Sequence, residues 1–179
     1  MRFSQAISEG DGISLIVDVT DAEAARAAAA QGAEAVVVRA GLGDGVDLPV
    51  LWRGSSSPAD AAAAGADAWI VSVGDASDHD DDHGLDRVVA VSDEEELALA
   101  LERFDPEIFL FTVGEDAEAD ALQRALDLLP DLPAGKLAVA DARVSSREQV
   151  DELERAGVDA VIVGARNVAG LVDGAPPQV

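Results

Sequence analysis

Two arginines and two aspartates stand at the ends of apolar runs, where charged side chains could act on a small molecule. They are Asp18, Arg39, Arg53 and Asp141. Guanidinium groups bind phosphate or carboxylate, and a carboxylate can act as a general base. Asp18, Arg53 and Asp141 are therefore candidate catalytic residues, with Arg39 and Arg53 holding an anion. Equal numbers of opposite charges also fit a self-neutralising network that closes the site without a ligand.

A second group of residues could hold phosphate near the end of the chain. Gly164, Ala165 and Arg166 follow the last apolar run, and with Asn167 they are expected to open a short helix with free N–H groups. Arg143, two residues after Asp141, is a further candidate phosphate ligand. The alternative is an ordinary turn between a strand and a helix.

Metal and cofactor chemistry have little support in the sequence. His79-Asp80-Asp81-Asp82-His83 holds both histidines, but such an acidic loop is usually solvated and no second cluster completes a site. The chain has no cysteine. It also lacks the G-x-G-x-x-G and Walker A patterns of nucleotide-binding loops. We therefore expect neither a metal nor a cofactor.

One phrase occurs three times: QGAEAVVV at 31–38, AAGADAWIV at 63–71 and AGVDAVIVG at 156–164. In each copy a glycine follows a segment of helical composition, where a helix ends in a residue with positive φ. The apolar run that follows is typical of a strand buried on both faces. Each copy therefore predicts a junction from a helix to a strand.

The rest of the chain extends this pattern to a complete α/β domain. Eight strands are expected at 13–19, 35–40, 49–54, 68–73, 87–92, 107–113, 136–141 and 160–164. Five helices are expected at 21–31, 58–64, 93–103, 116–129 and 145–156, with Thr20, Ser92 and Ser145 as caps.

The segments after strands 2 and 4 are too Gly-rich or too polar for helices. These elements predict a single compact (β/α)₈ TIM barrel over residues 1–179, with helices missing at those two places. An open doubly wound sheet is the alternative.

Three stretches resemble the indole-3-glycerol phosphate synthase family of tryptophan biosynthesis. They are FSQAISEGDGISLIVDV, RVVAVSDEEELALALE and VADARVSSREQVDELERAGVDAVIVGARNV. The resemblance implies a barrel whose phosphate-binding turn lies at Gly164-Ala165-Arg166. It also implies a lyase activity that closes a ring with loss of CO₂ and water.

The family's catalytic positions carry different residues here. The family's first Glu and Lys fall at Asp18 and Thr20, and its second Lys falls at Arg53. Its second Glu falls at Ala90, and its Asn falls near Thr112. Its Glu-Ser-Gly falls at Asp141-Ala142-Arg143. Arginine stays protonated and is a poor general acid. We therefore expect a non-catalytic or metabolite-binding relative. The alternative is a lyase or isomerase acting on a phosphorylated metabolite.

Charge sets the expected partners and surroundings. The chain has 36 acidic and 12 basic residues, for a net charge of −24. Such a surface repels nucleic acid and anionic membranes, and no apolar stretch could span a bilayer. We expect a soluble cytoplasmic protein adapted to high salt, or one from a GC-rich genome. A phosphorylated small molecule is the expected partner, and the oligomeric state is not visible in the sequence.

Overall fold

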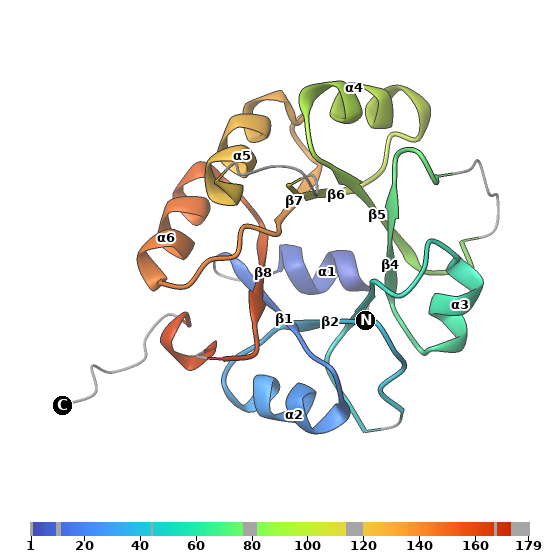
Figure 1. Cartoon of the computed structure of the whole chain (residues 1–179), viewed down its shortest axis with the longest axis vertical. Coiled ribbons are helices and arrows are strands. Elements are labelled where there is room, and N and C mark those ends of the chain that lie inside the picture. Colours follow the sequence, from blue (N-terminus) through green and yellow to red (C-terminus); the bar gives the residue numbers. More distant parts are fainter. Residues whose placement is uncertain are drawn as a thin grey trace.

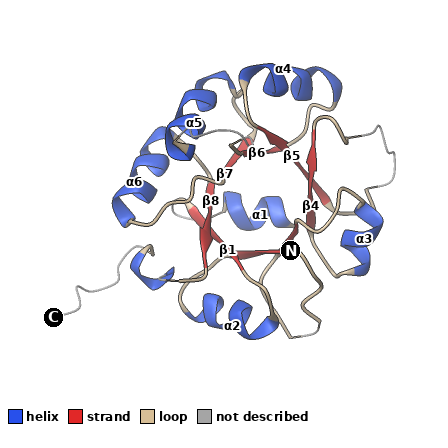
Figure 2. Cartoon of the chain, in the orientation of Figure 1, coloured by secondary structure: helices blue, strands red, loops and turns tan. Residues whose placement is uncertain are grey.

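Eight parallel strands close into a barrel, in which each strand pairs with the next and the last pairs with the first (Figures 1 and 2). The computed structural model describes residues 2–9, 12–43, 45–76, 82–113, 120–166 and 168–172. The strands are β1 (Ser14–Asp18), β2 (Ala35–Val38), β3 (Val50–Trp52), β4 (Ala68–Ser72), β5 (Asp86–Val91), β6 (Ile108–Phe111), β7 (Leu137–Ala140) and β8 (Ala160–Gly164). All eight overlap the predicted runs, and the predicted barrel is confirmed.

Helices surround the ring of strands, apart from one short helix that appears within the ring (Figure 2). The helices are α1 (Phe3–Ser8), α2 (Ala22–Ala30), α3 (Pro58–Ala63), α4 (Glu94–Arg103), α5 (Ala121–Leu128) and α6 (Arg147–Ala156), with 3-10 turns η1 (Leu129–Asp131) and η2 (Val168–Gly170). The five predicted helices correspond to α2 to α6, although 116–119 lie outside the described residues. Within the described ranges, no helix has the length and hydropathy that crossing a membrane requires.

The crossovers after β2 and β4 contain no helix in the residues that the structure describes, as predicted. Leu42, Val46 and Leu48 pack against the outer core in the first of these crossovers and partly replace the missing helix. After β8 the described chain forms only the single turn η2, and Asn167 lies outside the described residues. In the described residues after β8, the expected last helix is a single 3-10 turn.

The two tryptophans fill the barrel wall beside these shortened crossovers. Trp52 and Trp69 are register partners on β3 and β4, and both are buried in the outer core. The Trp52 ring lies against Gly54, where a Cβ would collide with it. Arg87 lies over the Trp69 ring, with its guanidinium carbon 5.5 Å from the ring centroid. Both tryptophans therefore have a packing role in the barrel wall.

The helix-to-strand phrase forms the same structure in all three copies. Gly32, Gly65 and Gly157 have φ of 98°, 76° and 100°, as expected for residues that end a helix. The acidic residue that follows each glycine makes two bonds to one residue of the neighbouring strand. Its N–H donates to the backbone carbonyl of that residue, and its carboxylate accepts from the same residue's N–H. We call this pair of bonds a carboxylate clasp.

The three clasps secure three different strands near their amino ends. Glu34 clasps Leu15, Asp67 clasps Val50 and Asp159 clasps Ala138, with N–H to carboxylate distances of 3.2, 2.9 and 2.8 Å. Buried backbone N–H groups need acceptors, so each carboxylate removes an unsatisfied donor. The acidic residue of the repeated phrase is therefore structural.

The helix α1 closes the amino end of the barrel. Phe3 and Ile7 are fully buried in the inner core, and the N–H of Ser4 donates to a carboxylate oxygen of Asp86 at 2.8 Å. Asp86 is the first residue of β5, so this bond ties the helix to the base of that strand. The buried hydroxyl of Ser14 has no hydrogen-bond partner among the described residues.

Side chains alternate between the inside and the outside of the barrel wall. The inner core contains Phe3, Ile7, Ile16, Ala35, Val37, Leu51, Ala68, Val88, Ile108, Leu110, Val139, Ala160 and Ile162. The outer core packs the strands against the helices. Since alternation has a period of two, it fixes which residues face inward where each strand ends.

Candidate site at the carboxyl end of the barrel

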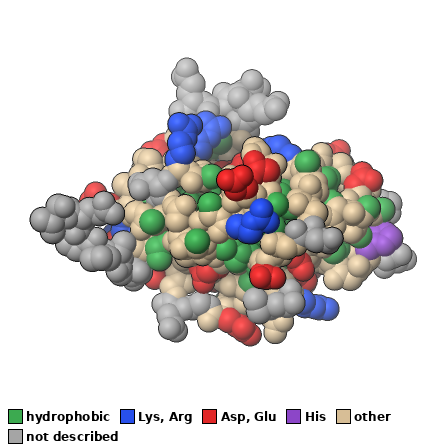
Figure 3. Space-filling view, turned by 90° about the horizontal axis from the view of Figure 1, so that it is seen from below, with side chains coloured by type: hydrophobic (Ala, Val, Ile, Leu, Met, Phe, Trp, Pro, Cys, Tyr) green, Lys and Arg blue, Asp and Glu red, His purple; other side chains and the backbone are tan. Residues whose placement is uncertain are grey.

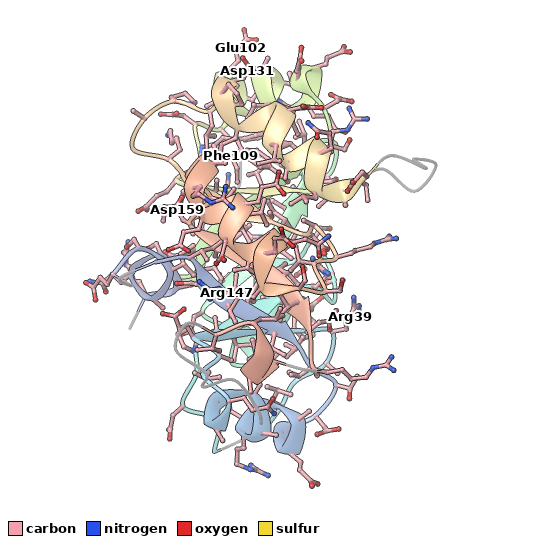
Figure 4. The ribbon with its side chains drawn as sticks, turned by 90° about the vertical axis from the view of Figure 1, so that its left-hand side faces the viewer. Arg39, Glu102, Phe109, Asp131, Arg147 and Asp159 are labelled. Carbon is pink, nitrogen blue, oxygen red and sulfur yellow. The ribbon has the colours of Figure 1, made fainter. Side chains whose placement is uncertain are left out.

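The inward positions at the carboxyl ends of the strands are all polar or glycine. In strand order they are Asp18, Arg39, Arg53, Ser72, Ser92, Thr112, Asp141 and Gly164. Because all eight strands are parallel, these residues meet at one mouth of the barrel, where the active sites of such barrels lie. Figure 4 views the barrel from the side, with Arg39 and Asp159 at opposite ends.

The four charged residues predicted from the sequence form one chain of ion pairs. Arg39 donates to both carboxylate oxygens of Asp18, at 2.9 and 3.0 Å. Arg53 donates to a carboxylate oxygen of Asp141 at 2.8 Å and lies 4.0 Å from Asp18. The order is therefore Arg39, Asp18, Arg53, Asp141, with two positive and two negative charges.

Arg53 spans the mouth to make this chain. It follows β3, whereas Asp141 follows β7, on the opposite side of an eight-stranded ring. The Arg53 side chain is 21% exposed and the two aspartates are 28% exposed, whereas Arg39 is 57% exposed. Arg53 is therefore the best shielded of the four side chains and holds the two aspartates in place.

This arrangement limits the acid and base chemistry of the mouth. Both carboxylates already accept hydrogen bonds from guanidinium groups, which leaves fewer lone pairs for a substrate proton. Arg53 stays protonated at ordinary pH and is a poor proton donor. The geometry matches the neutralised network that the sequence left open as an alternative.

The candidate phosphate ligands that follow β7 and β8 are exposed, and their positive charges are not paired with a described carboxylate. Arg143 has a φ of 49°, and both Arg143 and Arg166 are solvent-exposed. Neither forms an ion pair with a carboxylate in the part of the chain that the structure describes. Gly164 and Ala165 are also exposed, and a Cβ at Gly164 would have no atom within 4 Å. These residues leave an accessible cationic side to the mouth.

The acidic loop after β4 is only partly described. Asp82 pairs with Arg87 at 2.7 Å, which commits one of the five potential metal ligands. His79, Asp80 and Asp81 lie outside the described residues, and no group of three or more His, Cys, Asp or Glu suited to a metal occurs among those described.

In the described part of the chain, two carboxyl groups outside the ion-pair chain have shifted pKa values. The hydrogen bond from the backbone N–H of Ala24 lowers the pKa of Asp21, which caps α2. Burial raises the pKa of Asp159 against the opposing effect of its bond from the Ala138 N–H. Both groups have structural partners, so neither is poised for catalysis.

The charged residues of the mouth and Ala90 are among the residues named from the sequence, whereas Ile70 and the inward position of Ser72 are not. Ile70 and Ala90 face inward one step below Ser72 and Ser92, and both are partly exposed. The residues below them, Ala68 and Val88, are fully buried. Counting back two positions from Ser72 and Ser92 identifies Ile70 and Ala90 as inward-facing, because side chains alternate along a strand.

The fold and its polar mouth define a (β/α)₈ barrel with the layout of barrels that bind small molecules at the carboxyl ends of their strands. No protein-family model matches the sequence. Indole-3-glycerol phosphate synthase from Variovorax paradoxus (strain S110) is 38% identical over 81 residues. The match covers 45% of this chain and 30% of that enzyme, so the chain spans less than a third of the curated relative's length.

Two solved structures share the fold at low sequence identity. N-acetylmannosamine-6-phosphate 2-epimerase from Clostridium perfringens has a TM-score of 0.72 at 13% identity, over 95% of this chain and 91% of that chain. (S)-3-O-geranylgeranylglyceryl phosphate synthase from Thermoplasma acidophilum has a TM-score of 0.61 at 14% identity, over 96% and 94%. They support the barrel architecture.

Proposed function

We propose that this protein is a metabolite-binding barrel, a relative of indole-3-glycerol phosphate synthase without its ring-closing activity. The ligand is a phosphorylated small molecule bound at the mouth, and the protein works in the cytoplasm. One observation carries the proposal: the mouth has a neutralised side and a cationic side. The chain Arg39, Asp18, Arg53, Asp141 makes the first, and Arg143 with Arg166 makes the second.

The neutralised side argues against catalysis. Ring closure with loss of CO₂ and water needs a proton donor and a base. The position of the catalytic lysine holds Arg53, and the position of the strand-five glutamate holds Ala90. Loss of such groups lowers rates by orders of magnitude.

The cationic side argues for an anionic ligand. Only 12 of the 179 residues are Lys or Arg, yet four of them, Arg39, Arg53, Arg143 and Arg166, lie at strand ends around the mouth. In many (β/α)₈ barrels the loops after strands 7 and 8 hold phosphate. Arg143 and Arg166 follow those two strands, and Gly164 and Ala165 leave room for close approach.

A thermal-shift titration in molar KCl tests the binding proposal. Inorganic phosphate, indole-3-glycerol phosphate and its anilino-sugar phosphate precursor are the probes. We expect a concentration-dependent shift that the double variant R143A/R166A abolishes. R155A removes an exposed arginine from the far end of α6 and serves as the matched control. Absence of any shift at millimolar concentration would defeat the proposal.

An assay for indole-ring formation from the anilino-sugar phosphate tests the absence of catalysis. We expect no turnover above the uncatalysed rate. Measurable turnover that R53A removes would favour the alternative, a lyase or isomerase that uses Asp18, Arg53 and Asp141. The observation that favours this alternative is that both aspartates remain 28% exposed at the mouth and can be reached by a substrate.

A further inference from the structure

The crossover after β2 leaves an apolar groove on the outside of the barrel wall. The groove lies between α2 and α3, where the described residues of the crossover form no helix (Figure 1). It consists of two adjoining hollows of about 450 and 280 Å³, which share Val46, Val50 and Gly65. The larger hollow is lined only by glycine, alanine, valine and leucine. The outer wall is therefore incompletely covered here.

This groove differs from the hollow beside η2, at the other end of the described chain. That hollow, of about 300 Å³, is lined in part by Glu34, Arg147 and Glu154. The Glu34 carboxylate accepts from the N–H of Leu15, and Arg147 lies 3.6 Å from Glu154. These charged groups have partners within the chain and are readily hydrated. The larger hollow after β2 offers no charged side chain, and a concave apolar surface on so acidic a protein is typical of an interface.

The neighbouring helix α2 has a composition that suits the groove. Seven of its nine residues are alanine, and Ala27, Ala29 and Ala30 are exposed. Such small side chains allow a helix to approach another surface closely. Because α2 lies beside the groove on one face, two copies related by a twofold axis can each place α2 in the groove of the other. A contact of this kind closes into a dimer.

The charges at the edge of the groove favour a second copy of this chain as the occupant. Arg26 of α2 reaches the crossover, since its Nη1 lies 3.9 Å from the position that a Cβ on Gly45 would take. Asp47, two residues further along, is exposed. Neither Arg26 nor Asp47 forms an ion pair within the described part of the chain. A twofold axis would let Arg26 of each copy pair with the partner's Asp47.

The other helical faces are less suited to contact between two copies. The helices α4 and α6 carry four acidic residues each, whereas α2 carries one. Bringing two copies of α4 or α6 together would place like charges opposite one another, which is unfavourable. The α2 face is therefore the one on which contact adds the least repulsion among these three helices.

We propose that the face from α2 across the groove to α3 is the interface of a homodimer. In this dimer α2 of each copy takes the place of the helix that the other copy lacks after β2. The interface uses the outside of the barrel wall, so the inference is independent of any ligand at the mouth.

Sedimentation equilibrium on the wild-type chain in molar KCl tests the proposal. The expected mass is twice that of one chain. Association should strengthen as KCl is raised, because screening reduces the repulsion between two copies that each have a net charge of −24.

Substitutions on the two halves of the contact should dissociate the dimer. A63R places a charge in the groove at an exposed position, and A30R does so on the exposed side of α2. Each is expected to weaken association about tenfold or more, because a charge removed from water without a partner is unfavourable. A98R, at an exposed alanine of α4, is the matched control and should leave association unchanged.

A charge exchange tests the pairing of Arg26 with Asp47. R26E and D47R each bring like charges together across the interface and are expected to weaken association. The double variant R26E/D47R restores opposite charges, keeps the net charge of the wild type and should recover its association. The comparison is made at the lowest KCl concentration at which all variants remain folded by circular dichroism, because salt screens ion pairs.

The outcomes decide between this face and any other. A monomer at every protein and KCl concentration would overturn the proposal. A dimer that both A63R and A30R leave intact would overturn it as well, because another face would then form the contact. If R26E/D47R associates no better than the single variants, the pairing across a twofold axis is wrong.

Discussion

The two ends of this barrel use carboxylates in different ways. At the amino end, Glu34, Asp67 and Asp159 accept from backbone N–H groups, and Asp86 accepts from the backbone of α1. At the mouth, Asp18 and Asp141 pair with guanidinium side chains. A backbone donor cannot move away without unfolding, whereas an arginine can exchange its carboxylate for a ligand anion. The comparison separates the acidic residues that hold the fold from those available for binding.

Acidic residues on the surface affect the stability of the whole molecule. Acidic side chains are scattered over the face shown in Figure 3, and basic side chains occupy a few separate places on it. With a net charge of −24, self-repulsion opposes the compact state unless salt screens it.

The largest expected change in stability comes from a substitution in α1, the helix that closes the amino end of the barrel. Phe3 is fully buried, and F3A is expected to destabilise the protein by about 3–5 kcal/mol in molar KCl, because it leaves a cavity. Chemical denaturation measures the change. L99A, at a leucine that is 40% exposed, is the control and should stay within about 0.5 kcal/mol. Equal midpoints for the two variants would show that α1 does not contribute to the core.

Salt should stabilise the folded protein as a whole while weakening the ion pairs at the mouth. We expect the unfolding midpoint to rise clearly from dilute buffer to molar KCl, because screening over a few ångströms removes the repulsion among 36 acidic residues. Thermal scans across a KCl series check this. A flat response would contradict adaptation to a salt-rich cytoplasm.

Removing one carboxylate from each end sharpens the comparison. D67A leaves the N–H of Val50 without its carboxylate acceptor and is expected to cost about 1–3 kcal/mol. D141A is expected to cost about 1 kcal/mol or less, since Arg53 is partly exposed and lies near Asp18. Denaturation in low and high KCl should show a salt-dependent cost for D141A alone. If D67A and D141A lowered the free energy of unfolding by similar amounts, the two ends would not use carboxylates differently.

The smallest expected effect tests the buried clasp of Asp159. A carboxyl with a raised pKa binds protons more strongly in the folded state, so its contribution to stability falls as the pH rises above the ordinary pKa of 3.8. D159N removes this charge and keeps an acceptor for Ala138. We expect D159N to be more stable than the wild-type protein at pH 7, with the difference vanishing below about pH 4.

The matched control for this experiment is D131N, at an exposed aspartate in η1. A stability gain that persists unchanged below pH 4 would mean that the desolvated charge of Asp159 is not its cause.

Much of this fold was predictable because its signals are local. The apolar runs identified all eight strands, and the glycines of the repeated phrase marked three helix ends. Their position at the ends of the apolar runs also placed Asp18, Arg53 and Asp141 at one end of the predicted barrel.

Other features depend on contacts that sequence patterns do not encode. The six residues of α1 are too few to show a period, although Phe3 and Ile7 are spaced for one helix face. The bond between Arg53 and Asp141 joins residues 88 positions apart and needs the closed ring.

The helix caps show the same limit at short range. Asp21, Asp93 and Ser146 cap α2, α4 and α6, one residue later than predicted in each case. The capping residue is the one with extended backbone directly before the helix, and adjacent polar residues cannot be ranked from composition.

The paired tryptophans have a practical consequence for spectroscopy. The chain has no tyrosine, so Trp52 and Trp69 account for nearly all of its near-ultraviolet absorption and emission. Both indoles pack on the outer side of the strands, whereas the side chains of the mouth face inward. Intrinsic fluorescence should therefore follow the opening of the barrel wall while remaining silent to a small ligand, which gives an internal optical separation of unfolding from binding.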